Sequence, residues 1–441
     1  MSGVLFYALL AGCGGEVRDA EAAEAVEVAP PNVLLIVVDT LRRDHLGAYG
    51  YERDTSPNLD RLAAESTRYE RAVSHAPWTT PAIGALLSSQ YPTTLGIQTE
   101  REVLPEPFVL LPEALVQAGY VTAAAVSHTF CSSRWGFDQG FDYFDEAGIA
   151  GGHDPEGAAP AVTRAALDFL AAEREAPFFL WLHYFDPHSD YYEHEGFDFP
   201  SDYSGPVTSG APFKRIEALA RDGALAGPNL QRVLDLYDSE IAYTDHHIGR
   251  VLDQLRATGA LDDTLVIVTA DHGEEFLDHR KLGHAHTLKD ELIGVPLIVR
   301  YPDSAPATVT RPVGLVDVYP TVLDIAGLPP RGDLAGVSLR DVSERPVFSE
   351  VRHRRLALKS VVDGPHKLVQ DQGAGNVGVF DVVADPAERS SLTRRDAGLT
   401  RRLLGLLEDW KTGLSPRHDA GTLTLSDDEQ SALRALGYLE N

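Results

Sequence analysis

The sequence predicts an α/β fold in which a mostly parallel central sheet is covered by helices on both faces. The first observation is a series of short, continuously apolar runs: Val33–Val38, Val121–Val126, Phe178–His183, Leu265–Ala270 and Val295–Val299. Strands without polar alternation are buried on both faces, which is typical of parallel sheets between two helix layers. The second observation is that helical segments separate these runs, as expected where each strand is followed by a crossover helix.

Four segments between the apolar runs are predicted to be helices. They read "SPNLDRLAAES", "LLPEALVQAG", "AVTRAALDFLAAE" and "NLQRVLDLYDSEIAYTDHHIGRVLDQLRATG". In such sheets, ligands bind beyond the carboxyl ends of the strands. We therefore expect the functional side chains directly after the apolar runs.

The chain is predicted to fold as a large catalytic domain, residues 31–344, followed by a small α+β subdomain, residues 345–441. The subdomain has its own strand and helix signals, "SVVDGPHKLVQ" and "RRLLGLLEDWKTG". Two segments break the alternation of strands and helices. Glu146–Pro160 is rich in glycine, and the irregular stretch Ser189–Pro228 is a candidate substrate-side insertion.

The first thirteen residues predict a processing signal rather than part of the fold. The run "VLFYALLAGC" is apolar, is too short to span a bilayer, and ends at Cys13 after small residues. It resembles a bacterial lipoprotein signal, which predicts lipid anchoring to a membrane through Cys13 at a periplasmic or cell-surface position. Residues 14–30 then form an acidic tether. The alternative is an unprocessed apolar N-terminus.

The charge of the chain limits its partners. The sequence has 38 Lys and Arg against 66 Asp and Glu, a formal net charge of −28. Nucleic acid is not expected as a partner, because phosphate backbones require clustered basic residues. Two cysteines, Cys13 and Cys131, imply no disulfide framework.

Three polar residues at strand ends predict a metal site. Asp39 follows the first apolar run, and Asp271 and His272 follow "LVIVTA". A carboxylate at the end of a buried strand is costly unless its charge is compensated, and one divalent ion shared by two strand ends compensates it. The imidazole favours Zn²⁺ or Mn²⁺, with Ca²⁺ also possible. The alternative for "DHG" alone is a turn with a capping aspartate.

The stretch "HAPWTTPAIGALLSSQYP" predicts a helix that begins next to a hydroxyl group. Pro81 suits the first helical position, with Thr80 as the N-cap. Thr79 then lies just before a helix N-terminus, where free amides and the helix dipole favour an anion. A pair of capping threonines without catalytic role is the alternative.

Many ordered motifs together resemble the sulfatase family of the alkaline phosphatase superfamily, from about Pro31 to the C-terminus. They include "PNVLLIVVDTLRRDHLGAYGY", "TTPAIGALLSSQYPTTLGI", "GFDQGFDYFD", "WLHYFDPHSDY", "VTADHGEEFLDH", "LGHAHTLKDELIGVPLIV" and "LVDVYPTVLDIAGLP". The resemblance implies a hydrolase fold with one divalent metal. It places the nucleophile at Thr79 and metal ligands at Asp39, Thr79, Asp271 and His272. Residues near the substrate's anionic oxygens are His188, His284, Lys289 and His128. His183, His246 and His247 are expected to be packing or surface residues.

The chain departs from the family pattern at several positions that matter for sulfate chemistry. Sulfatases oxidise a cysteine or serine to formylglycine, whereas oxidation of Thr79 would give a ketone, so no formylglycine is expected. Thr40 replaces a second carboxylate, Ile83 an arginine, Val126 a lysine and His272 an asparagine. The resemblance therefore implies a threonine-nucleophile variant.

The substrate implied by this variant is an anionic ester, namely a sulfated or phosphorylated sugar, lipid or aryl compound. The function implied is metal-dependent hydrolysis of sulfate or phosphate esters with Thr79 as the nucleophile. Two alternatives stay open at this point. One is a phosphodiesterase or a phosphoethanolamine- or glycerophosphate-type transferase, and the other is an inactive anion-binding module.

Overall fold

The centre of the molecule is a mixed, mostly parallel sheet of eight strands, which confirms the predicted fold class. The computed structural model describes residues 30–151, 157–199, 202–427, 430 and 433–434. The strand order is β13-β2-β12-β8-β1-β7-β5-β6. The bounds are β1 Asn32–Val38, β2 Thr67–Tyr69, β5 Val121–Val126, β6 Tyr143–Asp145, β7 Phe178–Tyr184, β8 Thr264–Ala270, β12 Leu297–Arg300 and β13 Ala307–Val309. Strands β8, β1, β7, β5 and β6 run parallel, and β12 is antiparallel to β8.

Four of the five apolar runs become central strands, and the fifth is divided. Proline 296 interrupts the run Val295–Val299, because a proline has no N–H to donate to a strand ladder. The short strand β11, Gly294–Val295, precedes it, and β12 follows it. β11 joins β3, Ala72–Val73, and β14, Val313–Gly314, in a separate sheet.

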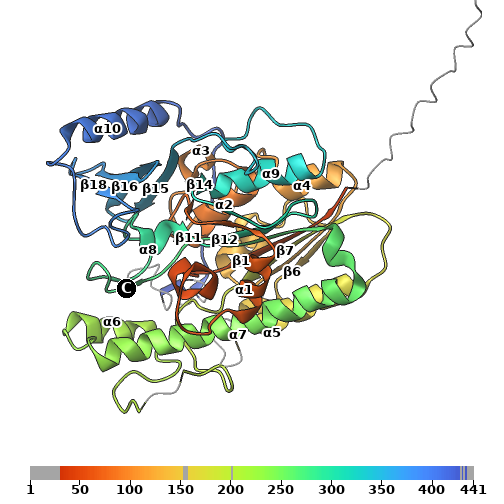
Figure 1. Ribbon diagram of the computed structural model, residues 1–441, viewed down its shortest axis with the longest axis horizontal. Coiled ribbons are helices and arrows are strands. Elements are labelled where there is room, and N and C mark those ends of the chain that lie inside the picture. Colours follow the sequence, from red (N-terminus) through yellow and green to blue (C-terminus); the bar gives the residue numbers. More distant parts are fainter. Residues whose placement is uncertain (1–29, 152–156, 200–201, 428–429, 431–432, 435–441) are drawn as a thin grey trace, which may run out of the picture.

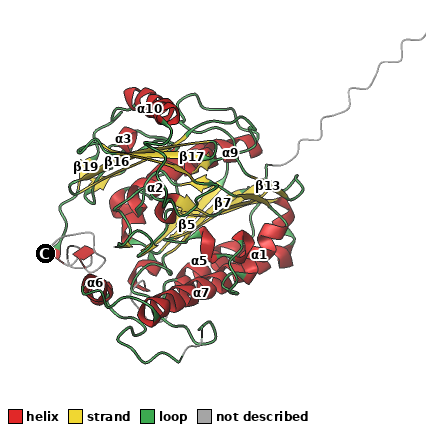
Figure 2. Ribbon diagram, turned by 60° about the vertical axis from the view of Figure 1, so that its left-hand side comes forward, coloured by secondary structure: helices red, strands yellow, loops and turns green. Residues whose placement is uncertain are grey.

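Helices cover both faces of the central sheet (Figures 1 and 2). One layer contains α1 Pro57–Ala64, α5 Ala159–Ala171 and α7 Pro228–Thr258, and α7 contacts both of the others. The other layer contains α2 Thr79–Ser88, α4 Leu111–Gln117 and α9 Val318–Ile325, which contact one another through α2. The shorter helices are α3 Pro92–Leu95, α6 Phe213–Arg221 and α8 Asp290–Ile293. Single turns of 3₁₀ helix link several of the strands to the helices.

A small antiparallel sheet lies near the C-terminus. It consists of β15 Val347–His353, β16 Leu356–Asp363, β17 His366–Asp371 and β18 Val377–Asp381. Helix α10, Ala397–Thr412, packs on it through Leu403 and Leu407, which share a core with Val361 and Leu368. After α10, the chain returns to the main domain, where β19, Gly421–Thr422, pairs with β4, Glu102–Val103. A further pair of strands, β9 Glu275–Phe276 and β10 Leu282–Gly283, forms a short hairpin.

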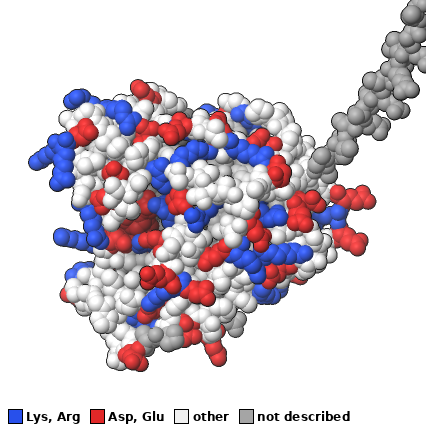
Figure 3. Space-filling view, viewed as in Figure 1, with Lys and Arg blue, Asp and Glu red and all other residues white. Residues whose placement is uncertain are grey.

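The predicted signal, residues 1–13, and the tether up to residue 29 lie outside the described residues. In the described part of the chain, no helix combines the length and apolarity needed to cross a membrane. On the face seen in Figure 3, acidic and basic side chains are interspersed.

Candidate active site

Two neighbouring strand ends bring Asp39 and Asp271 together. Parallel strands β1 and β8 are in register at Val38 and Ala270, so the residues that follow them lie side by side. Both side chains are fully buried. Among the residues that the structure describes, none forms a hydrogen bond with either carboxylate oxygen of Asp39 or with the Oδ2 atom of Asp271. Such buried, unsatisfied oxygens are rare in proteins and require an explanation.

His272 lies between the two carboxylates and Thr79. Its Nε2 atom lies 3.3 Å from Asp271 Oδ2, 3.5 Å from Asp39 Oδ1 and 3.3 Å from Thr79 Oγ1. Its Nδ1 atom lies 3.0 Å from the carbonyl oxygen of Gly273. A proton on Nδ1 satisfies that contact, so the lone pair of Nε2 faces the carboxylates.

This arrangement fits a divalent cation. Ligand atoms of Asp39, Asp271 and His272 all lie within 4.8 Å of one another. Burial raises the pKa of Asp39 well above its ordinary value, and the carboxylates of Asp271 and Glu274 raise it further. Burial also raises the pKa of Asp271. A cation between the two carboxylates would remove both penalties and occupy the unsatisfied oxygens.

Helix α2 places Thr79 beside this set. The helix begins at Thr79 with Trp78 as the N-cap, two residues earlier than the start expected at Pro81, so Thr80 is not the N-cap. Thr79 is fully buried, and its hydroxyl contacts His272. As a first-turn residue, it lies at the positive end of the helix dipole, where negative charge is stabilised.

Three of the four residues expected near substrate oxygens lie in the same cluster. His128 Nε2 is 3.9 Å from Asp39 Oδ2, and the ring of His188 lies 5.6 Å from the ring of His128. His284 continues the cluster, 5.0 Å from His188 and 4.7 Å from His272 between ring centroids. Burial lowers the pKa of His188 to about 3 and places those of His128 and His284 well below their ordinary value. Neighbouring imidazoles lower all three further.

The fourth residue, Lys289, has its described contacts elsewhere. Its ammonium donates to the backbone oxygen of Glu388 at 3.1 Å and lies 3.5 Å from the ring centroid of Phe380. The structure therefore places Lys289 against the C-terminal sheet and does not bring it into contact with the histidine cluster.

Sequence reasoning missed His183 as part of the cluster. It was expected to be a packing or surface residue, yet its Nε2 atom is 3.9 Å from Asp39 Oδ2. Neither of its ring nitrogens has a hydrogen-bond partner in the described part of the chain. The strand register explains this position. His183 pairs with Val37, two residues before Asp39, so both side chains point to the same face of the sheet. The run "FFLWLHY" is buried throughout, so no local pattern marked His183 as a site residue.

Glu274 is a second residue that sequence reasoning missed. It is fully buried, and its Oε1 atom lies 3.1 Å from His284 Nδ1. The hydroxyl of Tyr191 donates to its Oε2 atom at 3.2 Å. Tyr191 belongs to the stretch Ser189–Pro228, so part of this candidate insertion reaches the cluster. The carboxylate orients His284 in the way that a hydrogen-bonded partner fixes a functional imidazole.

Comparison with known proteins identifies the family of this chain. A family model described as "Sulfatase" matches residues 31–328. The chain belongs to the sulfatase family. It is 24% identical to an ulvan-active sulfatase of Formosa agariphila, over 93% of this chain and 87% of the relative.

Solved structures of other proteins share the fold. One, in complex with its substrate D-glucosamine-2-N,6-O-disulfate, is similar with a TM-score of 0.74 at 21% identity, covering 87% of this chain and 98% of the other. A phosphonate monoester hydrolase of Agrobacterium radiobacter is similar with a TM-score of 0.70 at 22% identity, covering 90% and 99%. Sulfatase-family enzymes typically use a divalent metal, and the Asp39–Asp271–His272 set of this member fits one.

Proposed function

We propose that this sulfatase-family hydrolase cleaves sulfate or phosphate esters with Thr79 as the nucleophile and with one divalent cation held by Asp39, Asp271, His272 and the Thr79 hydroxyl. The observation that carries the proposal is the buried contact of Thr79 Oγ1 with His272, within a set of unsatisfied carboxylate oxygens. A cation bound there would supply charge that lowers the hydroxyl pKa of Thr79 and neutralises the ester's nonbridging oxygens. The donor set suits Zn²⁺ or Mn²⁺.

Thr79 is positioned to attack the central atom of the ester. With a cation bound, the Thr79 hydroxyl would give up its proton to water. The bond from Thr79 Oγ1 to phosphorus or sulfur then forms, the bond to the ester oxygen breaks on the opposite side, and the leaving oxygen takes a proton from a neighbouring imidazole. The position of Thr79 at the N-terminus of α2 stabilises the negative charge that develops on its oxygen. A second in-line attack, by water, would release Thr79 and the inorganic product.

The histidines serve to bind the anionic ester and to supply the proton that the leaving alkoxide needs. In the free site, burial keeps His188 and His284 neutral, with the pKa of His188 at about 3. An anionic substrate beside these rings favours their protonated form and raises both pKa values. Glu274, in contact with His284 Nδ1, stabilises that protonated form further. His284 or His188 is then the general acid.

Two lines of argument bear on which ester is cleaved. The family match and the sulfatase relatives favour a sulfate ester. The chemistry of threonine favours a phosphate ester, because formylglycine can expel sulfate by elimination, whereas threonine lacks that route. A phosphothreonine can instead be cleaved by water. A phosphonate monoester hydrolase has a similar fold, so hydrolysis at phosphorus is compatible with this fold.

Two other functions are the competing hypotheses. A phosphodiesterase or a phosphoethanolamine- or glycerophosphate-type transferase would use the same Thr79 chemistry with a second alcohol in place of water. An inactive anion-binding module would need no reactive threonine. The unsatisfied oxygens of Asp39 and Asp271 favour an active site over that module, since a module without a cation would gain nothing by keeping them buried.

The test is a matched rate comparison on purified protein loaded in turn with Zn²⁺, Mn²⁺ or Ca²⁺. The substrates are an aryl sulfate, an aryl phosphate and a diaryl phosphodiester, with Thr79→Ala as the variant and His246→Ala, a substitution on the exposed side of α7, as the control. We expect turnover of at least one ester that depends on the metal, vanishes in Thr79→Ala and survives in His246→Ala. Turnover that survives in Thr79→Ala would overturn the assignment of the nucleophile.

We also propose a location, which rests on the sequence alone. The run that ends at Cys13 supports lipid attachment there, which would hold the enzyme on a membrane facing the periplasm or the cell exterior. Labelling of cells with a radioactive fatty acid tests this. The wild type is expected to incorporate the label and Cys13→Ser is not, and equal labelling of the two would contradict the proposal.

A further inference from the structure

A second cluster of metal-ligating side chains lies outside the candidate active site. It consists of His279, Glu291 and Glu388, whose ligand atoms all lie within 4.8 Å of one another. His279 belongs to the loop of the β9–β10 hairpin, Glu291 to helix α8, and Glu388 to the segment that follows β18. The set shares no residue with the metal set of the candidate active site. It therefore brings together two segments of the catalytic domain and one segment of the C-terminal region.

Glu291 carries a buried oxygen that the chain leaves unsatisfied. Its side chain is 6% exposed, and its Oε1 atom forms no hydrogen bond within the part of the chain that the structure describes. Its Oε2 atom lies 3.8 Å from His279 Nε2, which is beyond hydrogen-bond distance. Burial, together with the carboxylates of Glu388 and Glu275, raises the pKa of Glu291 to about 8, although Lys367 opposes the rise. Protonation alone would not satisfy Oε1, so this carboxyl group requires an explanation.

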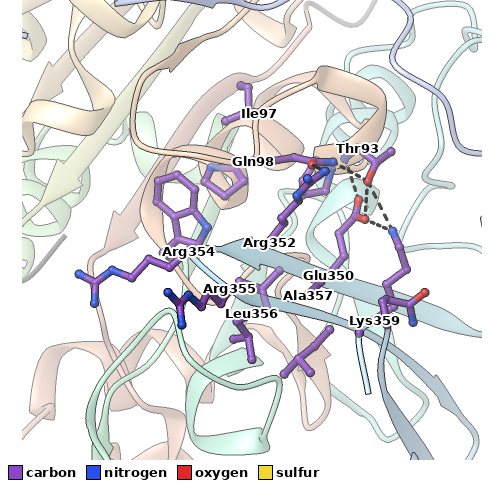
Figure 4. A pocket seen from close by; sticks show the side chains of 17 residues that line it. Thr93, Ile97, Gln98, Glu350, Arg352, Arg354, Arg355, Leu356, Ala357 and Lys359 are labelled. Carbon is purple, nitrogen blue, oxygen red and sulfur yellow. Dashed lines mark hydrogen bonds and ion pairs between the residues drawn. The ribbon is translucent and has the colours of Figure 1, made fainter. Parts of the chain in front are cut away.

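The pocket shown in Figure 4 contains a buried carboxylate that the chain satisfies by itself. Glu350 accepts from the backbone and the hydroxyl of Thr93, and it forms an ion pair with Lys359. Both of its oxygens are therefore bonded. Glu291 differs, because no donor among the described residues reaches its Oε1 atom, as expected for an atom that binds a ligand.

Glu388 is held in place by contacts that leave it able to bind a metal. Its side chain is fully buried, and its Oε2 atom accepts from the backbone N–H of Asp290 at 2.9 Å. Its Oε1 atom lies 3.1 Å from Nζ of the buried Lys367, and its Oε2 atom lies 4.0 Å from Lys289 Nζ. Each carboxylate oxygen has two lone pairs, so one contact leaves the second pair available. The two ammonium groups repel a cation, so the affinity is expected to be lower than at a site without lysines.

A pocket of about 300 Å³ gives a cation access to the cluster. Its lining includes His279 and Glu291 together with Pro386 and Arg389, which flank Glu388 in the chain. The side chain of His279 is 25% exposed. Three protein ligands leave one position of a four-coordinate ion open, and water from the pocket would fill it.

The donor set and its spacing suit Zn²⁺. One imidazole and two carboxylates are ligands that Zn²⁺ accepts. Two donors about 2.1 Å from one Zn²⁺ ion lie roughly 3.4 Å apart in tetrahedral coordination. His279 Nε2 and Glu291 Oε2, at 3.8 Å, are close to that separation.

We propose that His279, Glu291 and Glu388 form a second divalent-cation site, suited to Zn²⁺, which ties the β9–β10 hairpin and helix α8 to the C-terminal region. The hairpin lies between Glu274 and His284 in the chain, so a cation here also holds the segment that carries both residues. The role is structural, and it depends neither on the nucleophile nor on the ester.

Zn²⁺ binding to the Asp39→Asn/Asp271→Asn protein isolates the proposed site, because the candidate active site has then lost both carboxylates. The full chain is freed of metal with a chelator, dialysed and titrated with Zn²⁺ in a calorimeter. We expect one ion per chain. Adding Glu291→Gln or His279→Ala to this background should weaken binding at least tenfold. Glu106→Gln, at an exposed position, is the matched control and should bind Zn²⁺ as the background does.

Lys367→Met tests the site in the opposite direction. The substitution removes an ammonium group that repels the cation and keeps a long side chain in the buried position. Zn²⁺ binding should therefore tighten at least threefold, an outcome that a misfolded variant would not give. Weaker or unchanged binding would overturn the assignment of Glu388 as a ligand.

Metal content of the otherwise unmodified chain gives a second readout. After equilibration with Zn²⁺, Glu291→Gln should contain one ion per chain fewer than the wild type, as measured by elemental analysis. Equal Zn²⁺ content and equal binding with and without Glu291→Gln would overturn the site. Zn²⁺ binding that depends on Glu291 in a protein that hydrolyses no ester would retain the site and reject the proposed function.

Discussion

Asp39 and Asp238 are both buried carboxylates, yet they differ in their hydrogen-bond partners. Asp238 lies on α7, where its Oδ1 contacts His45 Nδ1 and its Oδ2 accepts from Tyr51 and Arg53, each at 2.7 Å. Asp39 has no hydrogen-bond partner on either oxygen within residues 30–151, 157–199, 202–427, 430 and 433–434. Its nearest charged neighbours include another carboxylate, Asp271. The difference teaches that the fold satisfies one buried carboxylate with its own donors and leaves the other unsatisfied, as the proposed cation site requires.

The largest effect is expected from Asp39→Asn, which removes one negative charge from the cluster. The value of kcat/KM should fall at least about 10³-fold, or about 4 kcal/mol of transition-state stabilisation, since a cation ligand is lost. The metal-free protein should gain about 1 kcal/mol in the free energy of unfolding, because the variant no longer buries two adjacent carboxylates. Kinetics and urea unfolding in the presence of a chelator measure the two effects. A loss of stability in the metal-free variant would contradict the comparison.

Asp238→Asn is expected to lower the stability of the protein and to leave its activity nearly unchanged. The substitution leaves Arg53 and His45 with a weaker partner, and breaking a buried ion pair costs about 3 kcal/mol of unfolding free energy. Because no described contact joins these residues to Thr79, kcat/KM should stay within a fewfold of wild type. Asp253→Asn is the control, since the Asp253–Arg61 pair at 3.0 Å is largely exposed and should contribute less than about 0.5 kcal/mol. Equal stability of the two variants would show that the Asp238 network is not structural.

Removal of divalent metal should change the stability of the wild type and of the two variants by different amounts. A cation that binds only the folded state at a concentration one hundred times its Kd adds about 2.7 kcal/mol to the free energy of unfolding. Chelation should therefore destabilise the wild type by roughly that amount. The free energy of unfolding of Asp39→Asn should fall much less on chelation. That of Asp238→Asn should fall as much as that of the wild type. Thermal unfolding with and without a chelator, followed by addition of Zn²⁺ or Mn²⁺, measures this. An unchanged wild type would mean that the cluster binds no cation.

The smallest effect concerns a third buried group, His75, which joins the catalytic domain to β15. Its Nδ1 donates to the oxygen of Phe348 at 2.6 Å, and its Nε2 accepts from the backbone of Val316 at 3.0 Å. Burial lowers the pKa of His75 to about 4 from 6.5. A folded-state pKa below the unfolded value means that the stability is fully present above pH 6.5 and is lost as the pH falls through 4.

The pH dependence of stability measures this contribution. Over that interval, the wild type should lose about 2 kcal/mol through His75, by the linkage relation. His75→Gln keeps a side-chain donor and acceptor without titrating, so its unfolding free energy should vary less between pH 7 and pH 4. Parallel pH profiles of the two proteins would show that His75 does not titrate on unfolding.

The sequence by itself determined the alternation of apolar strands and helices, and with it the parallel sheet. It also determined that Asp39, Asp271 and His272 directly follow apolar strands, because the end of an apolar run is a local pattern. The pairing of β1 with β8, which makes these two strand ends neighbours, was decided by the tertiary structure. Family motifs added Thr79, His128, His188 and His284, which the fold brings into one cluster. These features depend on residues that are close in sequence or that belong to a recurring motif.

The tertiary structure alone decided which remaining residues enter the site. His183 lies beside Asp39 because of the register between β1 and β7, which depends on how two distant strands pair. Glu274 is buried and bonded to Tyr191 because a segment some eighty residues earlier folds back over the cluster. Lys289 contacts Glu388 because the segment after β18 packs against the start of α8. Such contacts join residues far apart in sequence, and a local pattern carries no information about packing between separate elements.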